Sequence, residues 1–179
     1  MCTIIETLFY CKRNSENIFV NYQIYLANVF NSPFKMNLHI INGPNLNLLG
    51  IRQPELYGSR TFESYFLQLQ NQFKNHSIYY FQSNVEGILI DKLHEIGFNS
   101  DGIIINAGGY THTSVAIGDA LASITAPVIE VHISNIYARE PFRHQSYLSR
   151  HCKAVIAGAG LSGYSFALQL LTQQNDFSK

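Results

Sequence analysis

The sequence predicts an α/β fold in which a parallel β-sheet is covered by helices on both faces. From Met36 onward, short β-branched runs alternate with amphipathic stretches of helical period, the pattern of successive βαβ units. The first, third and fourth of these runs are apolar enough to be central strands. A chain of 179 residues can bury one substantial core but is short for two.

Five strands are expected, and a helix is expected after each of the first three strands and after the last. The strands are residues 38–41, 78–81, 102–105, 128–132 and 154–157. The helices are residues 61–75, 86–96, 112–124 and 162–174, each with its apolar side chains on one face. Thr61 is a candidate N-cap for the first helix, and Gly97 is a stop signal for the second.

Right-handed crossovers between these units give a flavodoxin-like three-layer sandwich with a five-stranded parallel sheet in the order 2-1-3-4-5. In such a sheet the ligand cleft lies beyond the carboxyl ends of the strands, where the strand order reverses. The cleft should therefore be built from residues 42–60, 106–113 and 132–143, which follow the first, third and fourth strands.

Residues 1–35 differ from the rest of the chain. They are rich in Asn, Tyr and Phe, contain no glycine and show neither a helical nor an alternating period. We interpret them as an N-terminal extension of doubtful order or as an overlong start of the reading frame, with the second interpretation preferred. The domain is expected to span residues 36–179.

Composition argues against charged partners and against a membrane. Charged residues make up 13% of the chain and the formal net charge is zero, so neither nucleic acid nor an anionic membrane surface is an expected partner. No apolar stretch reaches the roughly 20 residues of a transmembrane helix, and no export signal is recognisable. Cys2, Cys11 and Cys152 lie too far apart for a CxxC motif, which favours reduced thiols and a cytoplasmic location.

The first cleft segment reads NGPNLNLLGIRQPELYG, residues 42–58. Its glycine and proline favour a tight turn after the strand, and Asn45 can hydrogen-bond to backbone or ligand. Arg52 and Tyr57 lie on a glycine-bounded loop that could close over a site as a lid. The alternative is that the asparagines only form turns and that Arg52 is a solvated charge.

The second segment reads INAGGYTHTSVAIGDA, residues 105–120. Asn106 ends the third strand, and the two glycines after it would let backbone approach a ligand beside a helix N-terminus. His112 and Asp119 are seven residues apart, which would place them on one helical face. A capping histidine and a solvated aspartate remain the alternatives.

The third segment reads EVHISNIYAREPFR, residues 130–143. Glu130 and His132 would share one face of a strand, so the carboxylate could orient the imidazole. Arg139 and Arg143 are four residues apart and could share a helical face as an anion clamp. A lone histidine at a strand end is usually structural. No cluster of His, Cys and carboxylate side chains has metal-ligand spacing, so no metal is expected.

Taken together, the three segments resemble the type II 3-dehydroquinases from Met36 to about residue 171. NGPNLNLLG, R-x-P-x-x-Y-G, THTS, EVHISN and R-E-x-F-R occur in the family's order and spacing. The resemblance implies a cofactor-free dehydration of 3-dehydroquinate to 3-dehydroshikimate through an enolate, in the shikimate pathway of aromatic amino acid biosynthesis. The same reaction in quinate catabolism is an alternative.

The resemblance also implies the roles of individual side chains. Tyr57 would be the base, with Arg52 beside it to favour the tyrosinate. His132 would be the acid that protonates the leaving hydroxyl, with Glu130 as its orienting partner. Asn45 would hold a water against the enolate oxygen.

Further positions would bind the substrate's carboxylate and hydroxyls; they are Asn106, His112, Ile133, Ser134 and Arg143. Asp119 would reach into a neighbouring subunit's site, so the resemblance implies a trimer-based homo-oligomer, a homododecamer built as a tetramer of trimers. A non-enzymatic flavodoxin-like module that holds a phosphate or nucleotide is the competing interpretation. It leaves Tyr57 and His132 unexplained, and the sequence lacks the usual phosphate-loop and dinucleotide fingerprints.

Overall fold

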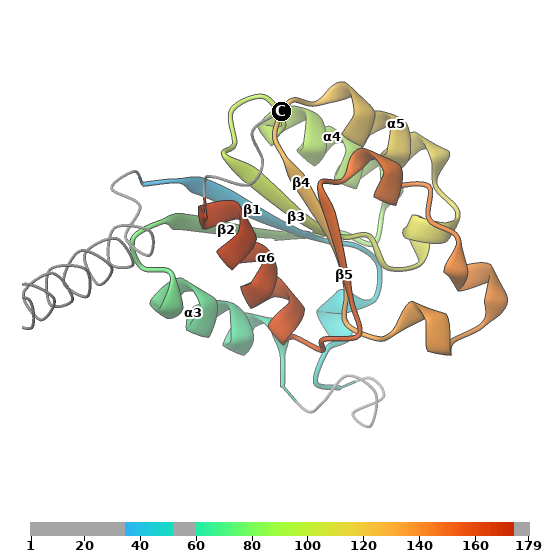
Figure 1. The fold of residues 1–179 in the computed structure, drawn as a ribbon, viewed down its shortest axis with the longest axis horizontal. Coiled ribbons are helices and arrows are strands. Elements are labelled where there is room, and N and C mark those ends of the chain that lie inside the picture. Colours follow the sequence, from blue (N-terminus) through green and yellow to red (C-terminus); the bar gives the residue numbers. More distant parts are fainter. Residues whose placement is uncertain (1–34, 52–59, 174–179) are drawn as a thin grey trace, which may run out of the picture. The chain divides into compact units, whose positions relative to one another are not determined.

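A computed structural model of the chain describes residues 35–51 and 60–173. It contains a five-stranded parallel sheet in the order β2-β1-β3-β4-β5, which confirms the predicted topology (Figure 1). The strands are β1 (Asn37–Asn42), β2 (Ser77–Gln82), β3 (Gly102–Asn106), β4 (Val128–His132) and β5 (Ala154–Ala157). Every residue of β3 and β4 is buried, as expected for central strands of a parallel sheet.

The helices cover both faces of the sheet (Figure 1). On one face lie α3 (Phe62–Gln72) and α6 (Ser162–Thr172), and on the other lie α4 (Glu86–Ile96) and α5 (Val115–Ser123). The predicted three-layer arrangement is therefore confirmed. Within the part of the chain that the structure describes, no helix combines the length and apolar character needed to cross a membrane.

Alternation along the strands separates the core into two layers. Neighbouring residues of a strand point to opposite faces. The layer under α3 and α6 contains Leu38, Ile40, Ile104, Val131, Phe62, Leu69, Tyr164 and Leu168. The layer under α4 and α5 contains Ile41, Ile103, Ile105, Val128, Leu89, Leu93, Ile117 and Leu121. Glu130 and His132 alternate with the residues of the first layer and so lie on the α4 and α5 side.

The predicted end signals of α3 and α4 are confirmed. Thr61 caps α3 by accepting a hydrogen bond from the backbone N–H of Ser64 at 3.2 Å. α4 ends at Gly97, although this glycine has an ordinary right-handed conformation, with φ of −66°. A Cβ atom at Gly97 would lie 2.3 Å from Cγ2 of Ile124, so close packing requires the glycine.

The third helix begins later than the sequence predicts. The segment Gly108–His112 forms a separate 3-10 turn, and α5 starts at Val115 after an N-cap at Ser114. The expectation that His112 and Asp119 share one helical face is therefore wrong, because His112 precedes the helix.

We expect a protein that begins at Met36 to fold as the full-length chain does. Residues 1–34 lie outside the described residues, whereas Met36 is buried and its carbonyl accepts a hydrogen bond from Ser77 N at 2.8 Å. Deletion of residues 1–35 should leave the circular dichroism spectrum of the folded domain unchanged. The melting temperature should stay within a few degrees of the full-length value, the shift that a change of about 1 kcal/mol in the free energy of unfolding would produce. An insoluble or unfolded truncated protein would show that the segment is part of the domain.

Candidate functional site

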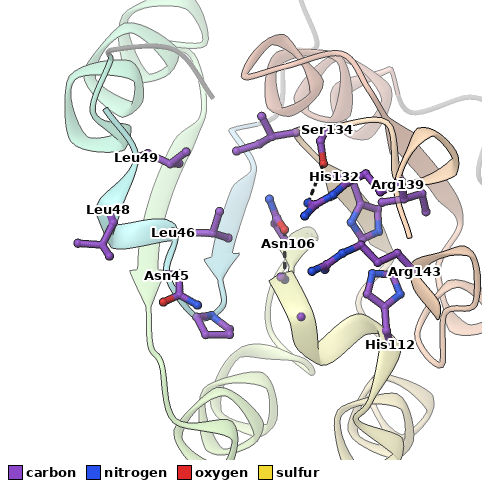
Figure 2. Close-up of a pocket in the computed structure, with 15 residues that line it drawn as sticks. Asn45, Leu46, Leu48, Leu49, Asn106, His112, His132, Ser134, Arg139 and Arg143 are labelled. Atoms are coloured by element: carbon purple, nitrogen blue, oxygen red, sulfur yellow. Dashed lines mark hydrogen bonds between the residues drawn. The ribbon is translucent and has the colours of Figure 1, made fainter. Parts of the chain in front are cut away.

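A pocket of about 170 Å³ opens at the carboxyl ends of β1, β3 and β4 (Figure 2). All of its lining residues belong to the three segments that the sequence selected. Among them are the predicted site residues Asn45, Asn106, His112, His132, Ile133, Ser134 and Arg143. Figure 2 shows Asn45 and the leucines of its loop on one side, the histidines and arginines on the other, and Asn106 between them. The predicted location of the cleft is confirmed.

Two of the remaining predicted site residues, Glu130 and Asp119, are described by the structure and do not line this pocket. Glu130 lies behind His132, fully buried. Asp119 is exposed on α5. Arg52 and Tyr57 fall outside the described residues.

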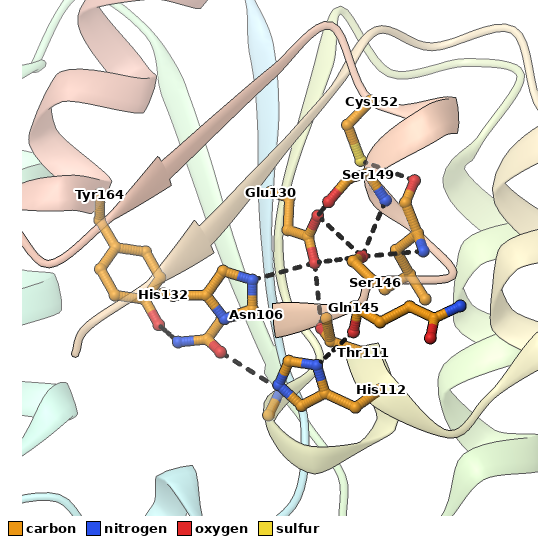
Figure 3. Close-up of polar contacts among 12 residues, drawn as sticks. Asn106, Thr111, His112, Glu130, His132, Gln145, Ser146, Ser149, Cys152 and Tyr164 are labelled. Atoms are coloured by element: carbon orange, nitrogen blue, oxygen red, sulfur yellow. Dashed lines mark hydrogen bonds and ion pairs between the residues drawn. The ribbon is translucent and has the colours of Figure 1, made fainter. Parts of the chain in front are cut away.

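Glu130 and His132 form a buried pair on β4. They are two residues apart, so their side chains point to the same face of the sheet, and Nε2 of His132 lies 3.0 Å from Oε1 of Glu130 (Figure 3). Burial by itself would raise the pKa of the Glu130 carboxyl group. Hydrogen bonds from His132, Ser149 and Thr111 outweigh burial and hold this pKa below its usual value, so Glu130 is ionised at neutral pH.

His112 is held in one tautomer. Its Nδ1 lies 2.6 Å from the backbone oxygen of Gln145, which can only accept a hydrogen bond, so Nδ1 carries the proton. Burial lowers the pKa of His112 and keeps the ring neutral at pH 7. Nε2 is therefore an acceptor, suited to a ligand hydroxyl. The ring stacks against that of His132 with 6.1 Å between centroids.

Asn106 presents an amide donor to the pocket because its other groups are occupied. Its Oδ1 accepts from Gly108 N at 3.2 Å, and its Nδ2 donates to the hydroxyl of Tyr164 at 2.9 Å. That hydroxyl donates in turn to Oδ1 of Asn42 at 2.9 Å. These partners fix the orientation of the amide, and the second N–H of Nδ2 remains for a carboxylate or other acceptor.

Two arginines of the described residues, Arg139 and Arg143, line the pocket, but they do not share an α-helix. Arg139 precedes the 3-10 turn Pro141–His144 that carries Arg143, so the predicted common helical face is wrong. Both guanidinium groups instead meet the Glu140 carboxylate, through Nε of Arg143 at 2.8 Å and Nε of Arg139 at 3.5 Å. Arg139 also donates to Oγ of Ser134 at 3.4 Å. A guanidinium has five N–H donors, so Arg143 keeps donors for an anion or hydroxyl.

The loop that carries Asn45 is pressed against the turn after β3. A Cβ atom at Gly43 would lie 2.5 Å from the backbone oxygen of Ala107, so only glycine fits. Asn45 itself has φ of 67°, a left-handed conformation that asparagine tolerates better than most residues. Its backbone N–H donates to Oδ1 of Asn84 at 2.9 Å. Asn84, which follows β2, thus fixes the backbone of Asn45.

Sequence reasoning missed the polar residues that support the pocket from behind. They are Asn42, Asn84, Thr111, Ser146, Ser149 and Tyr164. A polar residue that ends an apolar strand, as Asn42 does, is a usable signal. Isolated serines and threonines give no such signal in the sequence, because their hydrogen-bond partners come from distant segments.

Among the residues that the structure describes, no group of three or more His, Cys, Asp or Glu side chains is arranged to hold a metal ion.

Comparison with known proteins gives one consistent result. A family model described as "Dehydroquinase class II" matches residues 36–172. The 3-dehydroquinate dehydratase of Actinobacillus pleuropneumoniae serotype 5b is 53% identical over 131 residues, which cover 72% of this chain and 85% of that protein. The corresponding Yersinia enterocolitica protein is 50% identical over 137 residues, covering 75% and 91%.

Solved structures agree with these relatives. The type II dehydroquinase from Butyrivibrio crossotus superposes with a TM-score of 0.72 at 48% identity, covering 76% of this chain and 97% of that one. The type II dehydroquinase from Propionibacterium acnes gives a TM-score of 0.74 at 37% identity, covering 79% and 99%.

Replacing Tyr164 by Phe should destabilise the protein by about 1–3 kcal/mol, because Asn42 and Asn106 would each lose a hydrogen-bond partner, and Asn42 is fully buried. Urea denaturation measures this change. Tyr79→Phe is the matched control, since that tyrosine on β2 is 49% exposed. Equal stability of the two variants would mean that the buried hydroxyl contributes nothing.

Proposed function

Because the chain belongs to the class II dehydroquinase family, it catalyses the dehydration of 3-dehydroquinate, and we propose that the pocket at the carboxyl end of the sheet is where this occurs. The observation that carries the proposal is the buried Glu130–His132 pair, which faces Asn45 across a pocket lined with donors. The reaction removes a proton from the carbon beside the ketone, passes through an enolate and expels the neighbouring hydroxyl as water.

His132 is the acid that protonates the departing hydroxyl. The ring lines the pocket, and the ionised carboxylate of Glu130 offsets the positive charge that His132 bears when both ring nitrogens are protonated. With Nε2 directed at Glu130, the proton is delivered from Nδ1.

Tyr57 is the base and Arg52 is the cation beside it. A phenol has an ordinary pKa near 10. A neighbouring guanidinium lowers the cost of the tyrosinate and so makes the phenolate available near neutral pH. Support for both roles comes from the match of R-x-P-x-x-Y-G at residues 52–58 to the family's pattern.

Asn45 stabilises the enolate by holding a water against its oxygen. Its side chain lines the pocket, and its left-handed backbone is fixed by Asn84. Donors already in place where negative charge develops lower the barrier without having to reorganise during the reaction.

The substrate is held by Asn106 and by the side of the pocket opposite Asn45. Asn106 offers an N–H, and the backbone of Ile133 and Ser134 supplies further donors, a set suited to the carboxylate. Neutral His112 accepts from a ring hydroxyl through Nε2, and Arg143 donates to another.

The enzyme assembles as a trimer-based homo-oligomer, a tetramer of trimers, in which Asp119 enters a neighbouring subunit's site. Two observations support an interface at this position. Asp119 is exposed on α5 and does not line its own pocket. Its neighbourhood is apolar yet open to solvent, since Val115 is 55% exposed and Tyr147, whose backbone oxygen lies by Gly118, is 39% exposed.

We also place the enzyme in the cytoplasm, where thiols stay reduced. Cys152, the cysteine within the described residues, is a free thiol.

Tyr57→Phe should lower kcat by roughly 10²–10⁴-fold with only a modest change in KM, because the base acts mainly in the transition state. Arg52→Ala should behave similarly. The assay follows enone formation from 3-dehydroquinate in the ultraviolet, with Tyr79→Phe as a control on the far edge of the sheet. Near wild-type turnover by Tyr57→Phe would exclude it as the base and make His132 the leading candidate.

Mixing two inactive proteins, Arg52→Ala and Asp119→Ala, should restore activity once subunits exchange. A site is complete when its loop comes from an Asp119→Ala chain and its aspartate comes from an Arg52→Ala chain. If the two chains pair at random, about a quarter of the sites are complete. Mass spectrometry of isotope-labelled subunits verifies the exchange. If exchange is complete and no activity returns, Asp119 does not act across an interface.

A further inference from the structure

Besides His132, three hydroxyl groups from two parts of the chain surround the Glu130 carboxylate (Figure 3). Thr111 Oγ1 donates to Oε1 at 3.0 Å, and Ser149 Oγ donates to Oε2. Ser146 Oγ lies 3.3 Å from Oε1 and 3.4 Å from Oε2. We call Thr111, Ser146 and Ser149 the hydroxyl cluster.

A fully buried carboxylate next to an imidazole can share one proton with it in two ways. With one proton shared between the two side chains, it can sit on His132, giving an ion pair, or on Glu130, giving a neutral pair. Removal from water favours the neutral pair, because each buried charge loses its solvation. Only the ion pair leaves His132 with a second proton to give to a leaving hydroxyl.

Hydroxyl donors stabilise the ion pair relative to the neutral pair. An ionised carboxylate can accept all of the hydrogen bonds that the cluster offers, whereas a protonated carboxyl loses acceptor capacity and competes as a donor. Hydrogen bonds to a charged group are also stronger than those to its neutral form. Each donor in the cluster therefore favours the proton on His132.

We propose that Thr111, Ser146 and Ser149 are positioning residues for the dehydration, and that they keep the shared proton on His132 rather than on Glu130. This inference rests on the proposed role of His132 as the acid. None of the three hydroxyls lines the pocket, so they act through Glu130 and not on the substrate.

The other ionisable groups near Glu130 in the described residues do not supply this function. His112 is neutral, and its proton is committed to Gln145. Burial, reinforced by the nearby charge of Glu130, raises the pKa of the Cys152 thiol to about 12, so it adds no charge. Arg143 lines the pocket on the side of His112 and pairs with Glu140. Besides His132, the described side chains that meet the carboxylate directly are those of the hydroxyl cluster.

The turn that carries Ser146 and Ser149 also links the tautomer of His112 to the protonation of His132. Ser146 Oγ accepts from the backbone N–H of Leu148 and of Ser149, both at 3.0 Å, which orders the short turn and aims Ser149 at Glu130. The preceding residue, Gln145, supplies the carbonyl that fixes the tautomer of His112. Residues 145–149 therefore make one histidine an acceptor and help to make the other a donor.

The test removes single hydroxyls and follows the protonation of His132. Ser149→Ala, Thr111→Val and the double variant are labelled with ¹⁵N-histidine, and the ring-nitrogen shifts of His132 give the ratio of imidazolium to neutral imidazole in the full-length enzyme at pH 7. This ratio should fall by roughly tenfold or more for each hydroxyl removed, the effect expected for one hydrogen bond to a charged group. The double variant should show mostly neutral His132, and kcat should fall with the imidazolium fraction.

Controls separate this effect from a general loss of packing. Ser100→Ala removes a half-buried hydroxyl that donates to Ile96 O and should change neither quantity. Thr111→Ser keeps the donor and should restore both. The single variant Ser149→Ala, at a half-buried position, carries the test if the double variant does not fold.

Two outcomes distinguish this inference from the proposed function. If the proton stays on His132 in every folded variant, the hydroxyl cluster does not control it and the inference is wrong, even where kcat falls. If His132 becomes neutral in the variants while kcat is unchanged, the cluster controls the proton and His132 is not the acid.

Discussion

The site depends on a carboxylate that stays ionised although it is fully buried. Glu130 has no exposed surface, and isolation of its charge from water would be prohibitive without donors on every side. β4 supplies His132, the turn after β3 supplies Thr111, and the turn before β5 supplies Ser149. One carboxylate thus fixes three segments relative to one another, and its charge determines what chemistry the histidine can perform.

A second buried network holds the other half of the pocket. Asn42 and Asn106 lie side by side at the ends of β1 and β3, and the hydroxyl of Tyr164 from α6 bonds to both. The same strand ends carry Gly43, whose missing side chain lets the Asn45 loop approach the turn after β3. The Tyr164 hydroxyl therefore couples the packing of α6 on the sheet to the orientation of the Asn106 amide in the pocket, although Tyr164 itself does not line the pocket.

Much of the fold could be predicted from hydrophobic periodicity, because a helix or strand that buries one face has apolar residues at regular intervals in the sequence. All five strands and their order were predicted, and β4 and β5 matched residue for residue. The start of α5 was misplaced, since helical spacing alone cannot distinguish a 3-10 turn at residues 108–112 from the first turn of the helix. The same limitation produced the wrong helical face for Arg139 and Arg143.

The sequence by itself determined the layer architecture, the location of the cleft and the three segments that line it, because strand ends and glycine turns are local features that topology brings to one edge. It also placed Glu130 behind His132, since a separation of two on a strand sets a common face. Only the tertiary structure decided which side chains hold that pair, which tautomer His112 adopts and which way the amide of Asn106 points. Those depend on contacts between residues up to 122 positions apart, such as Asn42 and Tyr164, and no spacing along the chain encodes them.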